Sequence, residues 1–129
     1  MTESEYRQSI EEQSTIVDEY LSFIDKNPVN ETVASRIIGQ PKVSVLRNWR
    51  KNGLINPFKN DIARKVQYDS NLIKRAFVID ILVNEGLKIH EIRQALTGIT
   101  RVNVEIEKNY DKFTELLKSF FVSLKSFSE

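Results

Sequence analysis

Residues 32–57 read TVASRIIGQPKVSVLRNWRKNGLINP, and this stretch decides the fold. Its pattern predicts a short helix, a turn at residues 39–41, and a second helix that ends at Gly53. In a helix-turn-helix unit, two helices are joined by a short turn that often contains glycine, and the second helix can enter the major groove of DNA. Leu46 and Trp49 lie three residues apart and are therefore predicted to face inward together.

Positive charge is concentrated around this unit. Residues 1–35 contain two Lys/Arg and eight Asp/Glu, a net charge of −6. Residues 36–75 contain ten and two, a net charge of +8, and residues 76–129 contain seven and eight, a net charge of −1. A basic segment of this size favours a polyanionic partner, because phosphate contacts release counterions. A solvated Lys/Arg surface is the alternative.

Composition limits the classes of function that the chain can have. The 129 residues suffice for one domain with appended helices, and 40% of them are apolar, as in a soluble protein. No apolar run approaches the roughly 18 residues of a membrane span, and the acidic N-terminus does not resemble a secretory signal. The absence of cysteine excludes disulfides and thiolate metal sites, so the expected location is the cytoplasm, on the nucleoid.

The sequence offers little for enzymatic chemistry. His90 is the only histidine, so neither a cluster of metal-binding histidines nor a two-histidine site is expected. No glycine loop suited to phosphate occurs, and carboxylate pairs such as Glu11-Glu12 fall on the acidic face of a predicted helix. We therefore expect no enzymatic activity, no metal and no cofactor.

Long helices are predicted on both sides of the basic segment. Residues 3–26 form the first, because Thr2 and Glu5 have the spacing of a capping box and apolar residues recur every three or four positions. Residues 70–85 are apolar on nearly every face, which predicts the central helix of the core. A short helix at residues 89–96 follows.

The C-terminal segment, residues 103–126, is predicted to be a single long helix. Its apolar residues form a heptad-like seam: Val102, Ile106, Tyr110, Phe113, Leu117, Phe120, Leu124 and Phe127. We expect the six residues from Ile106 to Leu124 in this seam to pair two subunits of a homodimer, since DNA-binding proteins commonly read two half-sites by two-fold symmetry. Docking on the chain's own domain, against the N-terminal helix, is the alternative.

Residues 58–68 are the least helical part of the basic segment. Asn60-Asp61 is a turn candidate, with Phe58 on one side and Val66 on the other. This pattern predicts a small β-hairpin, or wing, whose basic residues would reach a DNA backbone. An ordinary basic loop is the alternative.

Several short motifs follow one another in this chain: Val33-Ala34 with Gly39, then Leu46-Arg47-Asn48-Trp49, then Lys51-Asn52-Gly53-Leu54-Ile55-Asn56-Pro57, then Tyr68 with Leu72, then Asn84 to Arg93. In this order and separation they resemble the DNA-binding domain of the MerR family of bacterial transcription regulators, over about half of the chain. The resemblance implies a winged helix-turn-helix followed by a long helix that pairs antiparallel in a homodimer. It also implies binding to inverted repeats, often with distortion of the DNA between the half-sites.

The sequence departs from the family's pattern in several places. The turn between Gly39 and Leu46 is one residue longer than usual, the predicted wing lacks the usual glycine, and Val66 stands where an arginine is common. Arg64 or Lys65 would have to replace that arginine. The N-terminal helix is not part of the common plan, and metal sensing by thiolates is excluded.

Candidate contacts with double-stranded DNA divide into two groups. Candidates for the groove, where arginine can hold guanine and asparagine can hold adenine, are Lys42, Ser44, Arg47 and Asn48. Phosphate contact is favoured for Lys42, Arg50, Lys51, Lys59, Arg64 and Lys65. Tyr68 either bonds a phosphate or packs at the base of the wing, whereas Trp49 and Leu54 are assigned to the core.

The sequence thus predicts a mostly α-helical protein with a small hairpin wing. Its expected parts are an N-terminal helical extension at residues 1–28, a MerR-like winged helix-turn-helix at 29–99 and a C-terminal dimerisation helix at 100–129. The expected function is sequence-specific transcription regulation as a homodimer. The alternatives are an architectural, segregation or excision-type DNA-binding protein, and an adaptor that binds another protein through its acidic N-terminal helix and its apolar C-terminal helix.

Overall fold

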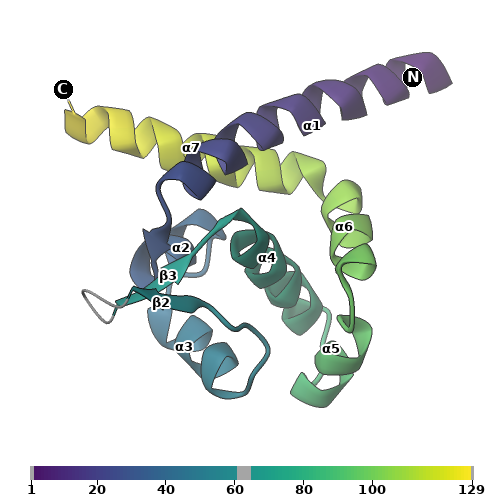
Figure 1. Ribbon diagram of the computed structural model, residues 1–129. Coiled ribbons are helices and arrows are strands. Elements are labelled where there is room, and N and C mark those ends of the chain that lie inside the picture. Colours follow the sequence, from purple (N-terminus) through teal and green to yellow (C-terminus); the bar gives the residue numbers. More distant parts are fainter. Residues whose placement is uncertain (1, 61–64, 129) are drawn as a thin grey trace.

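The chain folds around one buried helix, α4, with the helix-turn-helix and a small sheet on one side, α5 and α6 on the other, and α1 and α7 crossing over one end (Figure 1). The computed structural model describes residues 2–60 and 65–128. Its elements, in chain order, are α1 (Glu3–Lys26), β1 (Val29–Asn30), α2 (Glu31–Ile37), α3 (Val43–Lys51), β2 (Phe58–Asn60), β3 (Lys65–Tyr68), α4 (Ser70–Asn84), α5 (Ile89–Ala95), α6 (Ile99–Lys108) and α7 (Tyr110–Ser128). The fold is therefore mostly helical, as predicted.

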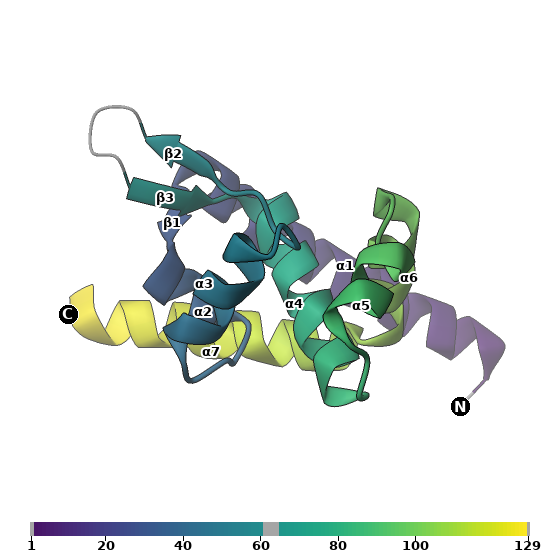
Figure 2. The same ribbon diagram turned by 90° about the horizontal axis from the view of Figure 1, so that it is seen from below.

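Helix α1 begins and ends where the sequence predicts. The hydroxyl of Thr2 accepts a hydrogen bond from the backbone N–H of Glu5 at 3.1 Å, and the Glu5 carboxylate accepts one from the N–H of Thr2 at 3.3 Å. The predicted capping box is thus confirmed. Val17, Leu21 and Ile24 are buried in its C-terminal half. Its N-terminal half projects beyond the rest of the molecule in both views (Figures 1 and 2).

Helices α2 and α3 form the predicted helix-turn-helix. Asn30 caps α2, because its side-chain oxygen accepts a hydrogen bond from the N–H of Val33 at 2.8 Å. Leu46 and Trp49 are buried, which confirms that they face inward. Leu54, just after α3, is also buried, which confirms its assignment to the core.

Glycine is needed after each helix of this unit. Gly39 and Gly53 have φ angles of +77° and +74°, in the left-handed region that residues with a side chain rarely adopt. Their surroundings differ. A Cβ at Gly39 would lie 2.9 Å from Cδ2 of Leu116, whereas a Cβ at Gly53 would meet nothing within 4 Å. The turn of the helix-turn-helix therefore lies directly against α7.

We expect Gly39→Ala to destabilise the protein more than Gly53→Ala. Both substitutions introduce left-handed strain of about 1–2 kcal/mol. Only Gly39→Ala also displaces the Leu116 side chain, which adds roughly 1 kcal/mol if that side chain leaves its rotamer. Urea unfolding of the two variants would measure the difference, and equal losses would show that the turn and α7 are not in contact.

Strands β2 and β3 form the predicted wing. They pair antiparallel, with Phe58 opposite Gln67 and Asn60 opposite Lys65. The prediction of a hairpin rather than a basic loop is thus confirmed. Residues 61–64, which include half of the turn candidate and the predicted phosphate contact Arg64, lie outside the described part of the chain.

A third short strand, β1, was not predicted from the sequence. Val29 and Asn30 pair antiparallel with Tyr68 and Gln67, so the sheet has the order β1-β3-β2. This pairing joins the entry to α2 directly to the wing. Since Asn30 also caps α2, one residue connects the sheet to the helix-turn-helix.

Helix α4 is the core element that its composition predicts. Its buried apolar residues face several neighbours and are Ile73, Ala76, Phe77, Val78, Ile79, Ile81 and Leu82. The ring of Phe77 stacks on that of Phe113 from α7, with centroids 4.5 Å apart and planes at 15°. Helix α5 follows at the predicted position.

The single C-terminal helix predicted at residues 103–126 is wrong, because the chain forms two helices. Helix α6 ends at Lys108 and α7 begins at Tyr110, with Asn109 between them at φ −124° and ψ 25°. The side-chain amide of Asn109 donates to the carbonyl of Glu105 at 2.8 Å. Asparagine competes in this way with the helical backbone for hydrogen bonds. The break lets α6 pack on α4 while α7 contacts α1 and α2.

The chain itself covers most of the predicted dimer seam. Ile106, Phe113 and Leu117 are buried within the single chain, and Tyr110 and Phe120 are half-buried. The side chain of Leu124 lies outside the described part. The three buried residues therefore pack within one chain, as in the docking alternative, and the pairing of two subunits through this seam stays a prediction. Helix α7 docks on its own domain and against α1, where the rings of Tyr20 and Phe121 stack at 4.6 Å.

Candidate nucleic-acid interface

The outer face of α3 carries exposed polar side chains. Ser44, Arg47, Asn48 and Lys51 are exposed and share one face of the helix, and Lys42 precedes them at the N-cap position. The opposite face is buried in the core. The structure thus brings together on one surface the four residues predicted for the groove, which are Lys42, Ser44, Arg47 and Asn48.

One groove candidate already has a partner within the chain. The side-chain oxygen of Asn48 accepts a hydrogen bond from the amide of Asn52 at 3.1 Å, and the same amide donates to the Asn48 carbonyl at 2.8 Å. Adenine is held by asparagine through both its oxygen and its nitrogen. The side-chain oxygen of Asn48 has a second lone pair, so Asn48 can contact adenine while it keeps this bond.

The C-terminal end of α3 is held by two arginines from the helices behind it. Arg93 donates to the carbonyl of Asn52 at 2.6 Å. Arg75 donates to the carbonyls of Leu54 at 2.5 Å and Leu96 at 3.1 Å. A guanidinium has several donors in fixed geometry, so Arg75 ties the loop after α3 to the end of α5.

The turn before α3 is held by a buried carboxylate of α4. Asp80 accepts a hydrogen bond from the side-chain amide of Gln40 at 3.1 Å, and the side-chain oxygen of Gln40 accepts one from the backbone N–H of Lys42 at 3.2 Å. The hydroxyl of Ser35 donates to the Gln40 carbonyl. These bonds hold in place the backbone that leads into α3, so the exposed face of α3 follows a well-anchored turn.

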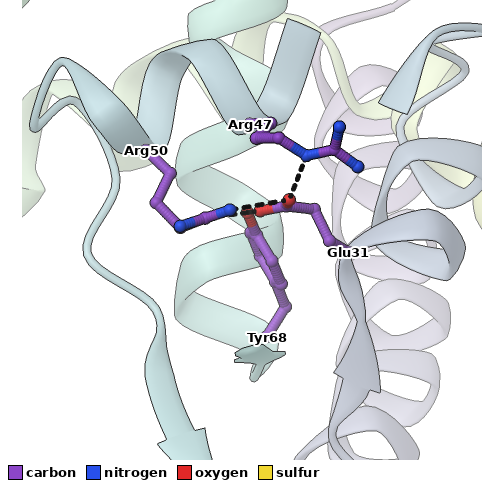
Figure 3. Close-up of polar contacts among 4 residues, drawn as sticks. All are labelled: Glu31, Arg47, Arg50 and Tyr68. Atoms are coloured by element: carbon purple, nitrogen blue, oxygen red, sulfur yellow. Dashed lines mark hydrogen bonds and ion pairs between the residues drawn. The ribbon is translucent and has the colours of Figure 1, made fainter. Parts of the chain in front are cut away.

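Two arginines of α3 share one carboxylate, that of Glu31 at the start of α2 (Figure 3). Arg50 donates to it twice, from Nε at 2.9 Å and from Nη2 at 3.3 Å. Arg47 approaches it through Nε alone, at 3.8 Å. The hydroxyl of Tyr68, from β3, donates to the same carboxylate at 2.6 Å. Glu31 therefore joins α2, α3 and the wing.

The charge of this cluster is stabilised by its own contacts. Burial alone would raise the pKa of Glu31, but the hydrogen bonds from Arg50 and Tyr68 and the charges of Arg50 and Arg47 outweigh it and hold that pKa below its ordinary value. Burial first, and then the hydrogen bond to Glu31 and its charge, raise the pKa of Tyr68 far above its usual range. The hydrogen bond to Glu31 raises the pKa of Arg50.

We expect Glu31 to make folding stability sensitive to acid. Because the folded-state pKa lies below the ordinary value of 4.5, the stabilisation is complete above that value and is lost as the pH falls through the folded-state pKa. Between about pH 5 and pH 3, Glu31→Gln should therefore lose less stability than the wild type. Urea midpoints at the two pH values would measure this. Glu107→Gln, at an exposed position of α6, should behave as the wild type, and a Glu31→Gln variant that did so would contradict the assignment.

Tyr68 and Arg50 were candidates for phosphate contact, but both side chains bond Glu31 within the chain instead. Tyr68 is fully buried and its hydroxyl proton is directed at Glu31, so the residue belongs to the core at the base of the wing. Arg50 faces the same carboxylate. Lys59 lies in β2 and Lys65 in β3, which puts both in the wing as predicted.

Sequence reasoning missed Glu31. Its only local signal is an acidic residue in the first turn of a helix, which is common there because it complements the helix dipole. Arg50 lies 19 residues and Tyr68 37 residues away along the chain. Only the packing of α2 against α3 and β3 brings the three together.

The described residues contain neither a metal-binding cluster nor a membrane-spanning helix. Residues 2–60 and 65–128 hold no group of three or more acidic, histidine or cysteine side chains arranged to bind a metal ion. Within the same ranges, no helix combines the length and apolar character needed to cross a bilayer.

The exposed face of α3, the polar contacts that brace it and the adjoining hairpin define a winged helix-turn-helix domain. A family model described as "MerR HTH family regulatory protein" matches residues 32–99. The chain belongs to this MerR helix-turn-helix family and is a DNA-binding transcription regulator, which confirms the resemblance seen in the motifs. Comparison with curated proteins and with solved structures gave no match.

Proposed function

We propose that the protein binds double-stranded DNA in a sequence-specific way, as a homodimer on an inverted-repeat site, and distorts the DNA between the half-sites. Helix α3 enters the major groove and presents Ser44, Arg47 and Asn48 to the base edges. The observation that carries this proposal is the exposed polar face of α3 on a rigid, buried support. A helix presented in this way fits the major groove, where each base pair shows a distinct pattern of donors and acceptors.

Phosphate contacts would flank the reading face. Lys42 and Lys51 stand at the two ends of α3, and Lys59 and Lys65 belong to the strands of the wing. Arg64, between those strands in the sequence, is proposed to join them. Such contacts fix the orientation of a protein on the duplex and make binding weaken with salt.

A second subunit would be held where α1 crosses α7. Phe23 of α1 is 48% exposed and meets the ring of Phe121 edge-on, with centroids 5.2 Å apart, and Val122 of α7 is 64% exposed. Exposed aromatic surface of this kind supports association with another protein surface. In this proposal the dimer uses the outer side of the α1–α7 pair, since the inner side of α7 is occupied by its own domain.

Selection of bound duplexes from a random pool, combined with light scattering, tests the proposal. We expect a palindromic consensus, affinity that falls as salt rises, and a mass of about twice the 15.0 kDa of one chain. A mass of one subunit together with indifference to every duplex at low salt would refute it. Many dispersed binding sites, rather than one site near a promoter, would instead favour an architectural or segregation role.

One observation favours a protein partner as a second candidate function. The N-terminal half of α1 projects away from the body (Figure 1) and carries Glu3, Glu5, Glu11 and Glu12. An adaptor would use this acidic helix to bind another protein. Deletion of residues 2–13 would then abolish that interaction while leaving DNA binding unchanged, whereas loss of DNA binding would assign the helix to the DNA complex.

A further inference from the structure

Glu31 makes different contacts with the two arginines of α3. Arg50 turns its guanidinium inward and uses two of its donors on the carboxylate. Arg47 approaches the carboxylate only through Nε, and its two terminal nitrogens point away from Glu31 (Figure 3). The side chain of Arg50 is 29% exposed and that of Arg47 is 51% exposed, while that of Glu31 is 12% exposed. The carboxylate of Glu31 therefore binds the guanidinium of Arg50 directly and leaves the terminal nitrogens of Arg47 pointing away from it.

This difference matters because arginine contacts DNA in two ways. Bidentate recognition of guanine needs a guanidinium fork aimed at the O6 and N7 atoms. A phosphate contact needs only a nearby positive charge and carries no sequence information. Arg47 presents the guanidinium fork that recognition of guanine requires. The positive charge of Arg50, which could serve a phosphate contact, is neutralised by Glu31.

We propose that Glu31 is a specificity-determining positioning residue, which withholds Arg50 from the phosphate backbone and orients Arg47 toward the bases. This role rests on the DNA binding proposed above. The carboxylate lowers the affinity for DNA of any sequence and keeps the base-reading arginine in a defined pose. Tyr68 holds the carboxylate from the wing side, so the hairpin and the reading helix are set by the same group.

Glu31→Gln tests this role, since glutamine keeps the shape and removes the charge. The variant is compared with the wild type on a random-sequence duplex and on the duplex selected for the wild type, over a range of salt. On the random duplex, release of Arg50 should steepen the slope of log affinity against log salt by about 0.9 and tighten binding roughly five- to tenfold at 0.1 M salt. On the selected duplex the gain should be smaller, so the ratio of specific to non-specific affinity falls.

Two further variants separate positioning from a change of charge or fold. Glu107→Gln changes the net charge equally at an exposed site on α6 and should leave the salt slope unchanged. Arg50→Ala added to Glu31→Gln should return the slope on random DNA to the wild-type value, because the gain acts through Arg50. These readouts would not move if Glu31 were merely structural.

The outcomes distinguish this role from the function on which it rests. If the wild type binds no duplex at low salt, the proposed function itself fails. If the wild type binds but Glu31→Gln has an unchanged slope and an unchanged affinity ratio, the positioning role is overturned. Should Glu31→Gln not fold, Arg50→Ala in the wild-type chain decides. A withheld Arg50 predicts no change of slope on random DNA, and a slope shallower by about 0.9 would refute the role.

Discussion

Phe113→Ala should lower the free energy of unfolding by about 3–5 kcal/mol. The side chain is fully buried, and its ring stacks on Phe77 at 4.5 Å, so truncation opens a cavity between α7 and α4 and removes the stacking contact. Small domains are stable by only about 5–15 kcal/mol. The substitution should therefore remove a large fraction of the protein's stability. Urea denaturation followed by circular dichroism would measure the loss.

An exposed apolar residue provides the control for this change. Ile99, on α6, is 60% exposed, and Ile99→Ala should cost less than about 1 kcal/mol. The Phe113 contact lies within one chain, so its loss should not depend on protein concentration. A strong dependence on concentration would instead place Phe113 in a subunit interface, as the heptad-like seam first suggested.

The second large effect concerns base recognition. Arg47→Ala should cost about 1–3 kcal/mol, roughly 5- to 150-fold, in affinity for the selected duplex and much less for random DNA. Its terminal nitrogens face outward from α3, and its ion pair with Glu31 is long, at 3.8 Å, and half-exposed. Such a pair contributes little to folding, so the loss would report on DNA rather than on stability.

Lys59→Ala is the matched comparison. Lys59 lies in the wing and is proposed to contact phosphate, so its removal should weaken binding to selected and random duplexes about equally. Affinities at two salt concentrations would be measured for both variants on both duplexes. Equal losses on the two duplexes for Arg47→Ala would remove the base-reading role from that residue.

Much of the fold could be predicted because its signals are local. The capping box of Thr2 and Glu5 depends on residues three apart, and the inward pair of Leu46 and Trp49 depends on one turn of helix. The same holds for the face of α3, since burying Leu46 and Trp49 leaves Arg47 outward. The exposed part of the candidate site therefore follows from helical periodicity.

The part of the site that was not predicted depends on distant residues. Glu31 meets Arg50 and Tyr68 only because α2, α3 and β3 converge, and nothing in the local sequence of any of these residues indicates the others. Arg75 shows the same difficulty, since it reaches carbonyls on two separate loops. Glu31 and Arg75 both support α3 from outside that helix.

The sequence by itself determined α1 to α5, including the helix-turn-helix, and the outward residues of α3, because each depends on the spacing of neighbours along the chain. The tertiary structure alone decided where the C-terminal apolar seam is buried. A heptad-like pattern specifies that a face must be covered but not by which surface. The break at Asn109 and the stacking of Phe113 on Phe77 settle this for Phe113 within one chain, because they bring the start of α7 onto α4.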